Sequence, residues 1–505
     1  MAKVSQLKAG VVLNYVTIFL NLVIGLVYTP YLLRMLGSSE YGLYSIAASV
    51  IAYLTVLDLG FGNAIVRYTS KFIAEGKKQA SEELYGMFLV LYLVIGAVAM
   101  LAGGAMAVNT ESIFGANMSG YEVGRMRIIL WIMTFNLAFT FPMSIWESIL
   151  MAHERFIFIR VVKILRTLLN PLVMVLLLVL GYKALALVIV TTAFNVLSLL
   201  AYCFHCFAGL KIRLRFARFK WAFLKEVGVY SLWIFFNALM DRIYWSTGQF
   251  VLGVVSGTVA VAVYAVAIKL QSMYMMFSTA ISSVFLPKVT RMVAVEDDRK
   301  EISDLFIRTG RIQYLVLALL LSGFVVFGRE FIVLWAGAGY EDAYIICLLF
   351  FIPLTVPLIQ NLGITILQAR NQMKFRSIVY LCIALLSLGL SIVLGRRFGG
   401  VGCAAATSGA LVLGQILIMN VYYRRRQGID IAAFWKEIGR MSLVPLLLMC
   451  AFMALSHSGL VSFASIWGLL GYAVLYTLLY CVLMWAFAMN PYEKELVLGL
   501  LHRRK

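Results

Sequence analysis

The chain has 505 residues, of which 63% are hydrophobic and only 13% are charged, whereas soluble proteins carry about 25% charged residues. This composition excludes an ordinary set of soluble domains and indicates a membrane protein. The net charge of +20 could suggest nucleic-acid binding. However, most Lys and Arg residues fall in every second gap between long apolar stretches. That distribution argues against nucleic acid, because loops that remain in the cytoplasm retain positive charge and set the topology.

The apolar stretches predict an all-α polytopic protein with fourteen transmembrane helices and both termini in the cytoplasm, because about 20 apolar residues cross a bilayer. The first stretch follows MAKVSQLK directly and lacks a small-residue cleavage site, so we expect an uncleaved helix. The predicted spans are 10–35, 41–64, 85–108, 126–150, 164–181, 184–207, 228–254, 259–286, 312–335, 343–368, 378–395, 401–422, 441–457 and 465–488.

A basic segment in the middle of the chain divides these spans into groups. Each group of six begins inside the cell and has an even number of spans, so two six-helix lobes parallel in the membrane are expected. The predicted organisation is an N-lobe (1–208), a basic cytoplasmic linker (209–227), a C-lobe (228–423), and two C-terminal spans with a cytoplasmic tail (424–505).

Short matches 220 residues apart agree with an internal repeat. YSIA at Tyr44–Ala47 matches YAVA at Tyr264–Ala267, and the turn at Gly37 falls beside Gly257. Transporter folds built from such repeats bind their substrate between the halves, near the middle of the membrane.

Ionisable residues within the predicted spans are candidates for function, because a charge there costs roughly 3 kcal/mol. Asp241, Arg242 and Lys269 lie on consecutive spans that form a hairpin, so they can approach one another. In one interpretation, Arg242 and Lys269 hold an anionic group in a hydrated cavity. In the other, Asp241 neutralises one of these cations, and the pair only pins two helices together.

Three further charges lie closer to the ends of their spans. Asp58 begins DLGFGN, whose glycines permit close packing or local unwinding, so this segment is a candidate hinge. Glu147 could couple an ion or pair with a loop cation. Arg166 is expected to extend toward the membrane interface. Pro353 and Pro357, one turn apart, predict a kink.

The sequence carries no sign of an enzyme or a cofactor. It has no phosphate-binding loop and no nucleophile–base constellation. The seven cysteines lie in or near apolar spans and are odd in number, which argues against a disulfide framework. The C-F-H-C run from Cys203 to Cys206 has no second cluster, so we expect apolar packing there and no metal site.

Several segments resemble a known family. They are LLRMLGSSEYGLYS between the first two spans, DLGFGNAIVRY closing the second, and DR followed by YAVAIKLQS across the seventh and eighth. These segments are similar to those of polysaccharide-biosynthesis flippases in the multidrug/oligosaccharidyl-lipid/polysaccharide superfamily. The resemblance implies two six-helix lobes around a central cavity, two extra helices and alternating access. It also implies that Arg242 and Lys269 bind the substrate, with Asp241, Asp58 and Glu147 in ion coupling or charge pairing.

The function implied by this resemblance is translocation of undecaprenyl-pyrophosphate-linked oligosaccharide across the bacterial plasma membrane for surface polysaccharide synthesis. An ion gradient or the membrane potential would drive it. Membrane lipids and a polysaccharide polymerase are the expected partners, and nucleic acid is not. A multidrug or cation antiporter and a lipid II flippase remain alternatives within the superfamily. A membrane-embedded transferase or a scaffold would belong to a different class.

Overall fold

The computed structural model describes residues 6–216, 221–295, 298–370, 372–458 and 465–502. The described residues form helices and no strand, as expected where backbone groups in lipid must be satisfied within each segment. The chain divides into two compact units, unit 1 (Met1–Ala262) and unit 2 (Val263–Lys505). Part of the predicted basic linker, residues 217–220, lies outside the described residues.

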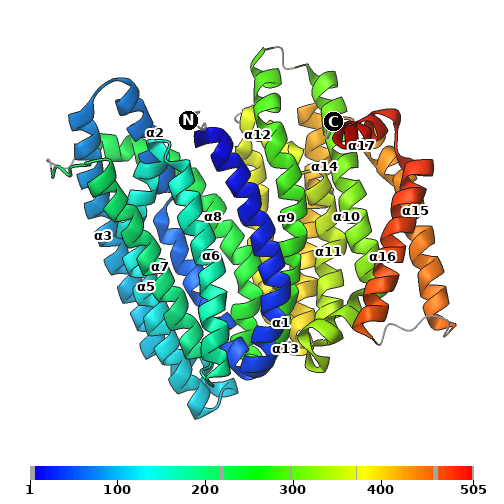
Figure 1. The fold of residues 1–505 in the computed structure, drawn as a ribbon, viewed down its shortest axis with the longest axis horizontal. Coiled ribbons are helices and arrows are strands. Elements are labelled where there is room, and N and C mark those ends of the chain that lie inside the picture. The colour runs from blue at the N-terminus through cyan, green and yellow to red at the C-terminus, as the bar shows by residue number, and fades with distance from the viewer. Residues whose placement is uncertain (1–5, 217–220, 296–297, 371, 459–464, 503–505) are drawn as a thin grey trace. The chain divides into compact units, whose positions relative to one another are not determined.

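Unit 1 consists of long helices joined by short turns (Figure 1). α3, α5 and α7 run side by side, and α1 packs against α6 and α8. Its elements are α1 (Gln6–Leu54), η1 (Thr55–Asp58), α2 (Phe61–Ala74), α3 (Lys78–Val108), α4 (Thr110–Phe114), η2 (Gly115–Asn117), α5 (Gly120–Ala152), α6 (Phe156–Val179), α7 (Ala184–Phe204), η3 (His205–Gly209), α8 (Trp221–Val255) and the first turn of α9 (Gly257–Val295).

A glycine turn divides α1 at the predicted boundary between the first two spans. Gly37 has a φ of 77°, a left-handed conformation that side chains rarely adopt. Gly257, its counterpart in the predicted repeat, also has a φ of 77°. The two predicted turns therefore share a left-handed glycine, and the internal repeat itself stays a prediction.

The residues after Gly37 fasten this turn to the rest of unit 1. The Ser39 hydroxyl donates to the Glu122 carboxylate at 2.6 Å. The buried Glu40 carboxylate accepts hydrogen bonds from the Tyr121 hydroxyl at 3.2 Å and from the Ala184 backbone N–H at 3.1 Å. Residues 37–40 thus join the turn between the two parts of α1 to the starts of α5 and α7.

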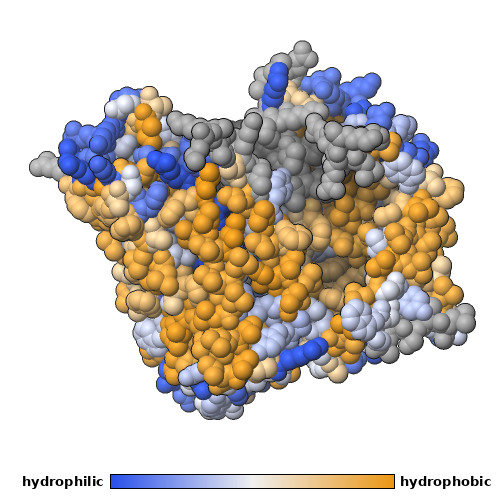
Figure 2. All heavy atoms as spheres, in the orientation of Figure 1, coloured by the Kyte–Doolittle hydropathy of each residue, from blue (hydrophilic) through white to orange (hydrophobic). Residues whose placement is uncertain are grey.

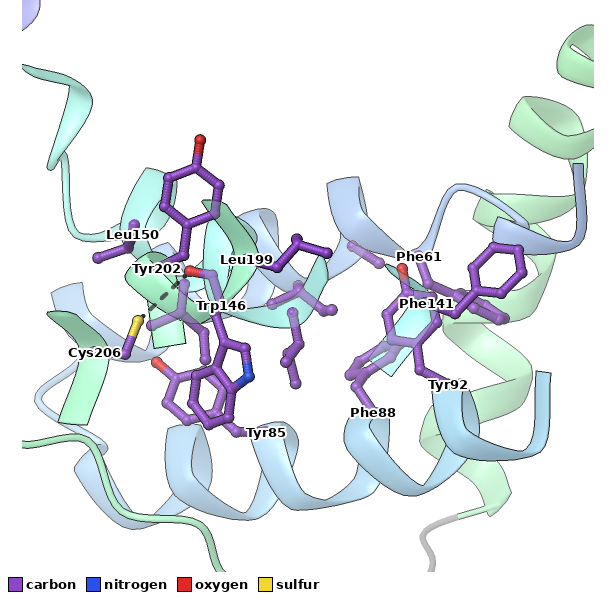
Figure 3. Close-up of a cluster of buried hydrophobic side chains, with 14 of the residues drawn as sticks. Phe61, Tyr85, Phe88, Tyr92, Phe141, Trp146, Leu150, Leu199, Tyr202 and Cys206 are labelled. Carbon is purple, nitrogen blue, oxygen red and sulfur yellow. Dashed lines mark hydrogen bonds between the residues drawn. The ribbon is translucent and has the colours of Figure 1, made fainter. Parts of the chain in front are cut away.

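The core of unit 1 is aromatic and closely packed (Figure 3). The Phe61 ring packs against those of Phe88 and Tyr92, with centroids 5.7 and 6.3 Å apart. α3 and α5 approach so closely that a methyl group on Gly103 would lie 2.4 Å from the Thr134 hydroxyl oxygen. Small residues allow this approach, as is common between membrane helices.

Unit 2 contains the rest of the chain (Figure 1). α10 packs against α11, α15 and α16. The elements are the remainder of α9, then α10 (Arg299–Ala336), η4 (Ala338–Tyr340), α11 (Ala343–Ile359), α12 (Leu362–Ala369), α13 (Met373–Leu411), η5 (Val412–Ile418), α14 (Met419–Tyr422), η6 (Tyr423–Gln427), α15 (Ile431–His457), α16 (Ile466–Leu483), η7 (Met484–Ala488) and α17 (Pro491–His502).

Two breaks shape the helices of unit 2. α11 and α12 meet at a bend of 44° at Gln360 and Asn361. This bend lies after both prolines, whereas a proline disrupts the helical turn that precedes it, so the kink predicted from Pro353 and Pro357 stays a prediction. α13 changes direction at Gly399, whose φ of 57° is also left-handed. The second break thus falls at a glycine, which adopts this conformation without the cost that a side chain would impose.

The helices have the length and apolar surface of membrane spans. Among the described residues, ten helices could cross a membrane, or eleven if the bent α11–α12 pair is one span. α6 exposes a row of side chains at helical spacing, namely Leu165, Leu169, Leu172, Leu176 and Val179. Figure 2 shows apolar side chains covering most of the visible helix surfaces, with hydrophilic residues gathered around α2. The chain is therefore a multi-pass membrane protein.

Candidate functional site

The predicted substrate-binding residues lie on α8 and α9, away from the faces that these helices pack within their units. α8 buries Met240, Tyr244 and Thr247, and the Thr247 hydroxyl lies 2.7 Å from that of Tyr53 on α1. Asp241 and Arg242 are both exposed. Successive helical residues point about 100° apart, so these two charges extend from different sides of α8.

Lys269, on α9 in unit 2, also lies away from the packed face of its helix. The packed face of α9 carries Tyr274, whose hydroxyl lies 2.7 Å from that of Thr355, and Ser278, which donates to the Leu358 carbonyl at 2.7 Å. Lys269 and Ser272 are exposed. Lys269 thus lies within a candidate membrane span but off its packed face. The expected approach of Lys269 to Arg242 stays a prediction.

Asp58 marks a break in the helix that follows Gly37. α1 ends at Leu54, a short 3₁₀ turn ends at Asp58, and α2 begins at Phe61. Leu59 and Gly60 between them have φ values of 52° and 71°. A left-handed conformation costs a non-glycine residue such as Leu59 about 1 kcal/mol or more. The irregular backbone predicted for DLGFGN is therefore present.

One side chain of α3 holds the Asp58 carboxylate at this break. The Tyr92 hydroxyl donates to Asp58 Oδ1 at 2.9 Å. The Tyr92 ring also stacks on Phe141 of α5, with centroids 6.5 Å apart. Figure 3 shows Tyr92 beside Phe61, Phe88 and Phe141. Tyr92 thus connects the Asp58 carboxylate to the aromatic core, and the Gly60 backbone N–H is a second donor to this carboxylate.

Glu147 pairs with a cation on the neighbouring helix. The Lys163 ammonium on α6 donates to Glu147 Oε1 on α5 at 2.5 Å. The side chains of both residues are partly exposed. This pairing is one of the two roles foreseen for Glu147.

Arg166 has a partner on a neighbouring helix that the sequence did not predict. Its guanidinium donates to the Asn195 side-chain oxygen on α7 at 2.7 Å, and its extension toward the membrane interface stays a prediction. The Asn195 amide in turn donates to Asn136 at 2.8 Å and Thr140 at 2.7 Å, both on α5. α7 thus supplies the amide acceptor for Arg166. The sequence signal for this position is the three-residue spacing of Lys163 and Arg166, which places both cations on one face of α6.

A buried charge cluster in unit 2, centred on Arg311, was not among the sites that the sequence predicted. Arg311 is only 5% exposed in its side chain, and Glu493 only 2%. The Arg311 Nε donates to Glu493 at 2.6 Å, and Arg311 Nη1 donates to Glu437. A further bond runs from Nη2 to the Ala488 carbonyl at 3.0 Å. This cluster attaches α17 to α10 and α15.

Cys203 and Cys206 of the C-F-H-C run pack in the core of unit 1, whereas Phe204 is exposed. The His205 ring stacks on Phe158 with centroids 4.1 Å apart. The Cys206 thiol donates to the Trp146 carbonyl at 3.5 Å (Figure 3). Within the described part of the chain, no group of three His, Cys, Asp or Glu side chains is arranged to hold a metal ion.

Comparison with known proteins places these features in context. A family model described as polysaccharide biosynthesis protein matches residues 31–345, more than half of the chain. A Shigella flexneri protein assigned as an O-antigen transporter is 19% identical over 402 residues, which cover 78% of this chain and 92% of that protein.

Solved structures share the fold at low sequence identity. The lipid II flippase MurJ, in an inward closed conformation, is similar with a TM-score of 0.72 and 17% identity, over 94% of this chain and 97% of that chain. An inward-facing multidrug-resistance transporter of the MATE family and the MOP superfamily is similar with a TM-score of 0.63 and 16% identity, over 83% of this chain and 96% of that chain. By its family match, this chain belongs to the polysaccharide biosynthesis protein family.

Proposed function

We propose that this protein carries a lipid-linked oligosaccharide across the bacterial plasma membrane for surface polysaccharide synthesis. Its family is that of polysaccharide biosynthesis proteins, and one relative is assigned as an O-antigen transporter. The similar solved structures are a flippase and multidrug transporters, not enzymes. The proposed substrate has an undecaprenyl tail, a diphosphate and a short glycan.

The observation that carries this proposal is the position of Arg242 and Lys269. Both are exposed charges on sides of α8 and α9 that are not packed within their own units, and Lys269 lies within a candidate membrane span. A charge that faced lipid at mid-membrane would cost about 3 kcal/mol, so a hydrated cavity is the more favourable environment. Two cations in such a cavity would hold a diphosphate while the lipid tail remained in the bilayer.

Movement between two openings would use the irregular backbone. The break from Asp58 to Gly60 in unit 1 and the 44° bend between α11 and α12 in unit 2 are candidate bending points. Asp241, Asp58 and Glu147 are the candidates for ion coupling or charge pairing. Glu147 already has the Lys163 partner, which favours charge pairing for this residue.

The proposed topology has fourteen spans with both termini in the cytoplasm. The helices Leu13–Ala74 and Met373–Gln427 contain 62 and 55 residues. At 1.5 Å per residue each is far longer than the roughly 30 Å of hydrocarbon. The ten candidate helices become twelve when these two are divided at Gly37 and Gly399. The α11–α12 pair, counted as one span, and α8 bring the number to fourteen. The basic loops then lie on the cytoplasmic side.

Export of cationic drugs is the second candidate, favoured by the MATE-like neighbours. A site for cationic drugs would be expected to present acidic groups, and Asp241 is an acid next to Arg242 in the sequence. Transport of lipid II is a further alternative within the fold of the MurJ flippase. Competition between the lipid diphosphate and a cationic dye for one reconstituted protein would distinguish these substrates.

Surface polysaccharide provides the cellular test. In a strain that depends on this protein, Arg242→Ala and Lys269→Ala should each reduce surface polysaccharide about tenfold, because each removes a charge-assisted hydrogen bond to phosphate. Protein level should be unchanged. Arg329→Ala is the matched control, because Arg329 is an exposed cation with a loop partner, Glu341. Normal export by the Arg242→Ala/Lys269→Ala double variant would rule out the proposed site.

A further inference from the structure

A basic cavity of about 350 Å³ lies where several helices of unit 2 end. It is formed by the last turn of α9, the first residue of α10, the loop between α12 and α13, and η6. Three of its lining residues are arginines, and no described lining residue is acidic. The lining residues are Val293, Arg299, Ala369, Arg370, Gln372 and Arg426.

Arg370 is oriented by a buried amide. Its Nη1 donates to the Gln427 backbone carbonyl at 3.0 Å and to the Gln427 side-chain oxygen at 2.9 Å. Gln427 is only 1% exposed, and its own amide donates to Gln372 at 2.6 Å. These bonds fix the direction of the Arg370 guanidinium before any ligand arrives, which lowers the entropy cost of binding.

Arg299 is positioned by a glycine. Gly428 has a φ of 70°, and a methyl group added there would lie 2.8 Å from Arg299 Cδ. The stem of Arg299 therefore lies directly against the backbone at Gly428. The adjacent carboxylate of Asp298 accepts a hydrogen bond from the Lys300 backbone N–H at 2.8 Å, so it caps the start of α10.

Three guanidinium groups around one cavity repel each other unless an anion joins them. Each guanidinium presents a planar set of donors that matches the oxygens of a phosphate. A carboxylate offers only two oxygens, whereas a phosphate offers enough acceptors for several arginines. The cavity lies at helix ends beside the basic run Arg424–Arg426, where the sequence predicts the surface of the cytoplasmic leaflet.

We propose that the cavity lined by Arg299, Arg370 and Arg426 binds a phosphate group. Its source is either the headgroup of an anionic membrane lipid or a free phosphate compound, since the two share the chemistry that the arginines recognise. The site lies within unit 2 and involves neither Arg242 nor Lys269. It therefore stands or fails independently of the proposed transport function.

The test measures binding to the purified full-length protein in neutral detergent. The probes are inorganic pyrophosphate, dihexanoyl-phosphatidylglycerol and dihexanoyl-phosphatidylcholine. We expect an anionic probe to bind and the zwitterionic lipid not to bind. Phosphatidylglycerol that binds more tightly than pyrophosphate identifies a headgroup site, and the reverse order identifies a site for free phosphate.

Variants then show whether the cavity itself is responsible. Arg426→Gln and Arg299→Gln should each weaken binding about tenfold, the usual effect of losing a charged hydrogen bond. Arg425→Gln is the matched control, because Arg425 is exposed in the same turn but does not line the cavity. Arg299→Lys keeps the charge but loses the planar donor set, so it should be intermediate.

Two results would overturn this assignment. One is that neither anionic probe binds to the protein. The other is an equal loss of binding in the Arg425→Gln and Arg426→Gln variants, which would mean that a diffuse basic surface, not the cavity, attracts the anion. Thermal unfolding midpoints within the error of the wild type would exclude misfolding as the cause of any loss.

Discussion

Units 1 and 2 bury their polar groups in different ways. In unit 1 the polar side chains of α5, α6 and α7 form small groups, in which Glu147 pairs with Lys163 and Asn195 contacts Arg166, Asn136 and Thr140. In unit 2 one cluster, centred on Arg311, ties α17 to the bundle. The first arrangement spreads weak restraints along three helices, whereas the second concentrates a strong restraint at one helix end. Local rearrangement is therefore less costly in unit 1.

The cavities at the helix ends differ in the charges of their lining residues. A cavity of about 250 Å³ in unit 1 is lined by Glu82 and by the cations Lys78, Lys211 and Arg213, besides the buried residues Ser81 and Tyr85. Glu82 accepts a hydrogen bond from Arg215 at 2.9 Å. The cavity in unit 2 has three arginines and no acidic lining residue among those described. The unit 1 cavity thus combines both signs of charge, whereas the charged residues described in the unit 2 cavity are all cations.

The largest expected effect is on the Arg311 cluster. Glu493→Gln removes the most buried carboxylate and leaves the Arg311 charge balanced by Glu437 alone. We expect a loss of about 3 kcal/mol in the free energy of unfolding, measured by thermal unfolding in detergent. Glu495→Gln on the same helix is the control, because Glu495 is exposed. Equal stability of the two variants would contradict a strong restraint at α17.

The second effect concerns the close packing of α3 against α5. Gly103→Ala would place a methyl group against Thr134, and overpacking of this kind costs about 2 kcal/mol. Gly124→Ala is the control, because no atom lies within 4 Å of the added methyl. If Gly103→Ala unfolds at the same temperature as the Gly124→Ala control, α3 and α5 can move apart at a lower cost than proposed.

The smallest effect is expected for Asn195, which links polar side chains of α5, α6 and α7 in unit 1. Asn195→Ala removes the acceptor of Arg166 and the donor to Asn136 and Thr140. Hydrogen bonds between membrane helices contribute about 0.6 kcal/mol on average, so we expect a loss of about 1 kcal/mol. Asn109→Ala, at an exposed helix end, is the control. A loss as large as that of Glu493→Gln would remove the distinction between the units.

The sequence predicted the features that depend on local composition. Apolar length predicted the membrane helices, and glycine predicted the turn at Gly37 and the break after Asp58. It did not predict the role of Arg311, because its partners Glu437 and Glu493 are 126 and 182 residues away. Charge counting alone cannot distinguish a loop cation from a buried one. The Asn195 partner of Arg166 was not predicted either, because it lies on the next helix.

The central claim is that Arg242 and Lys269 hold the diphosphate of a lipid carrier. The most direct measurement is flipping of a fluorescent undecaprenyl-diphosphate-linked sugar in liposomes that contain the purified protein. We predict that the Arg242→Ala/Lys269→Ala variant flips this lipid at least tenfold more slowly than wild type, while the Arg329→Ala control is unaffected. Equal flipping rates for the double variant and the wild-type protein would contradict the claim.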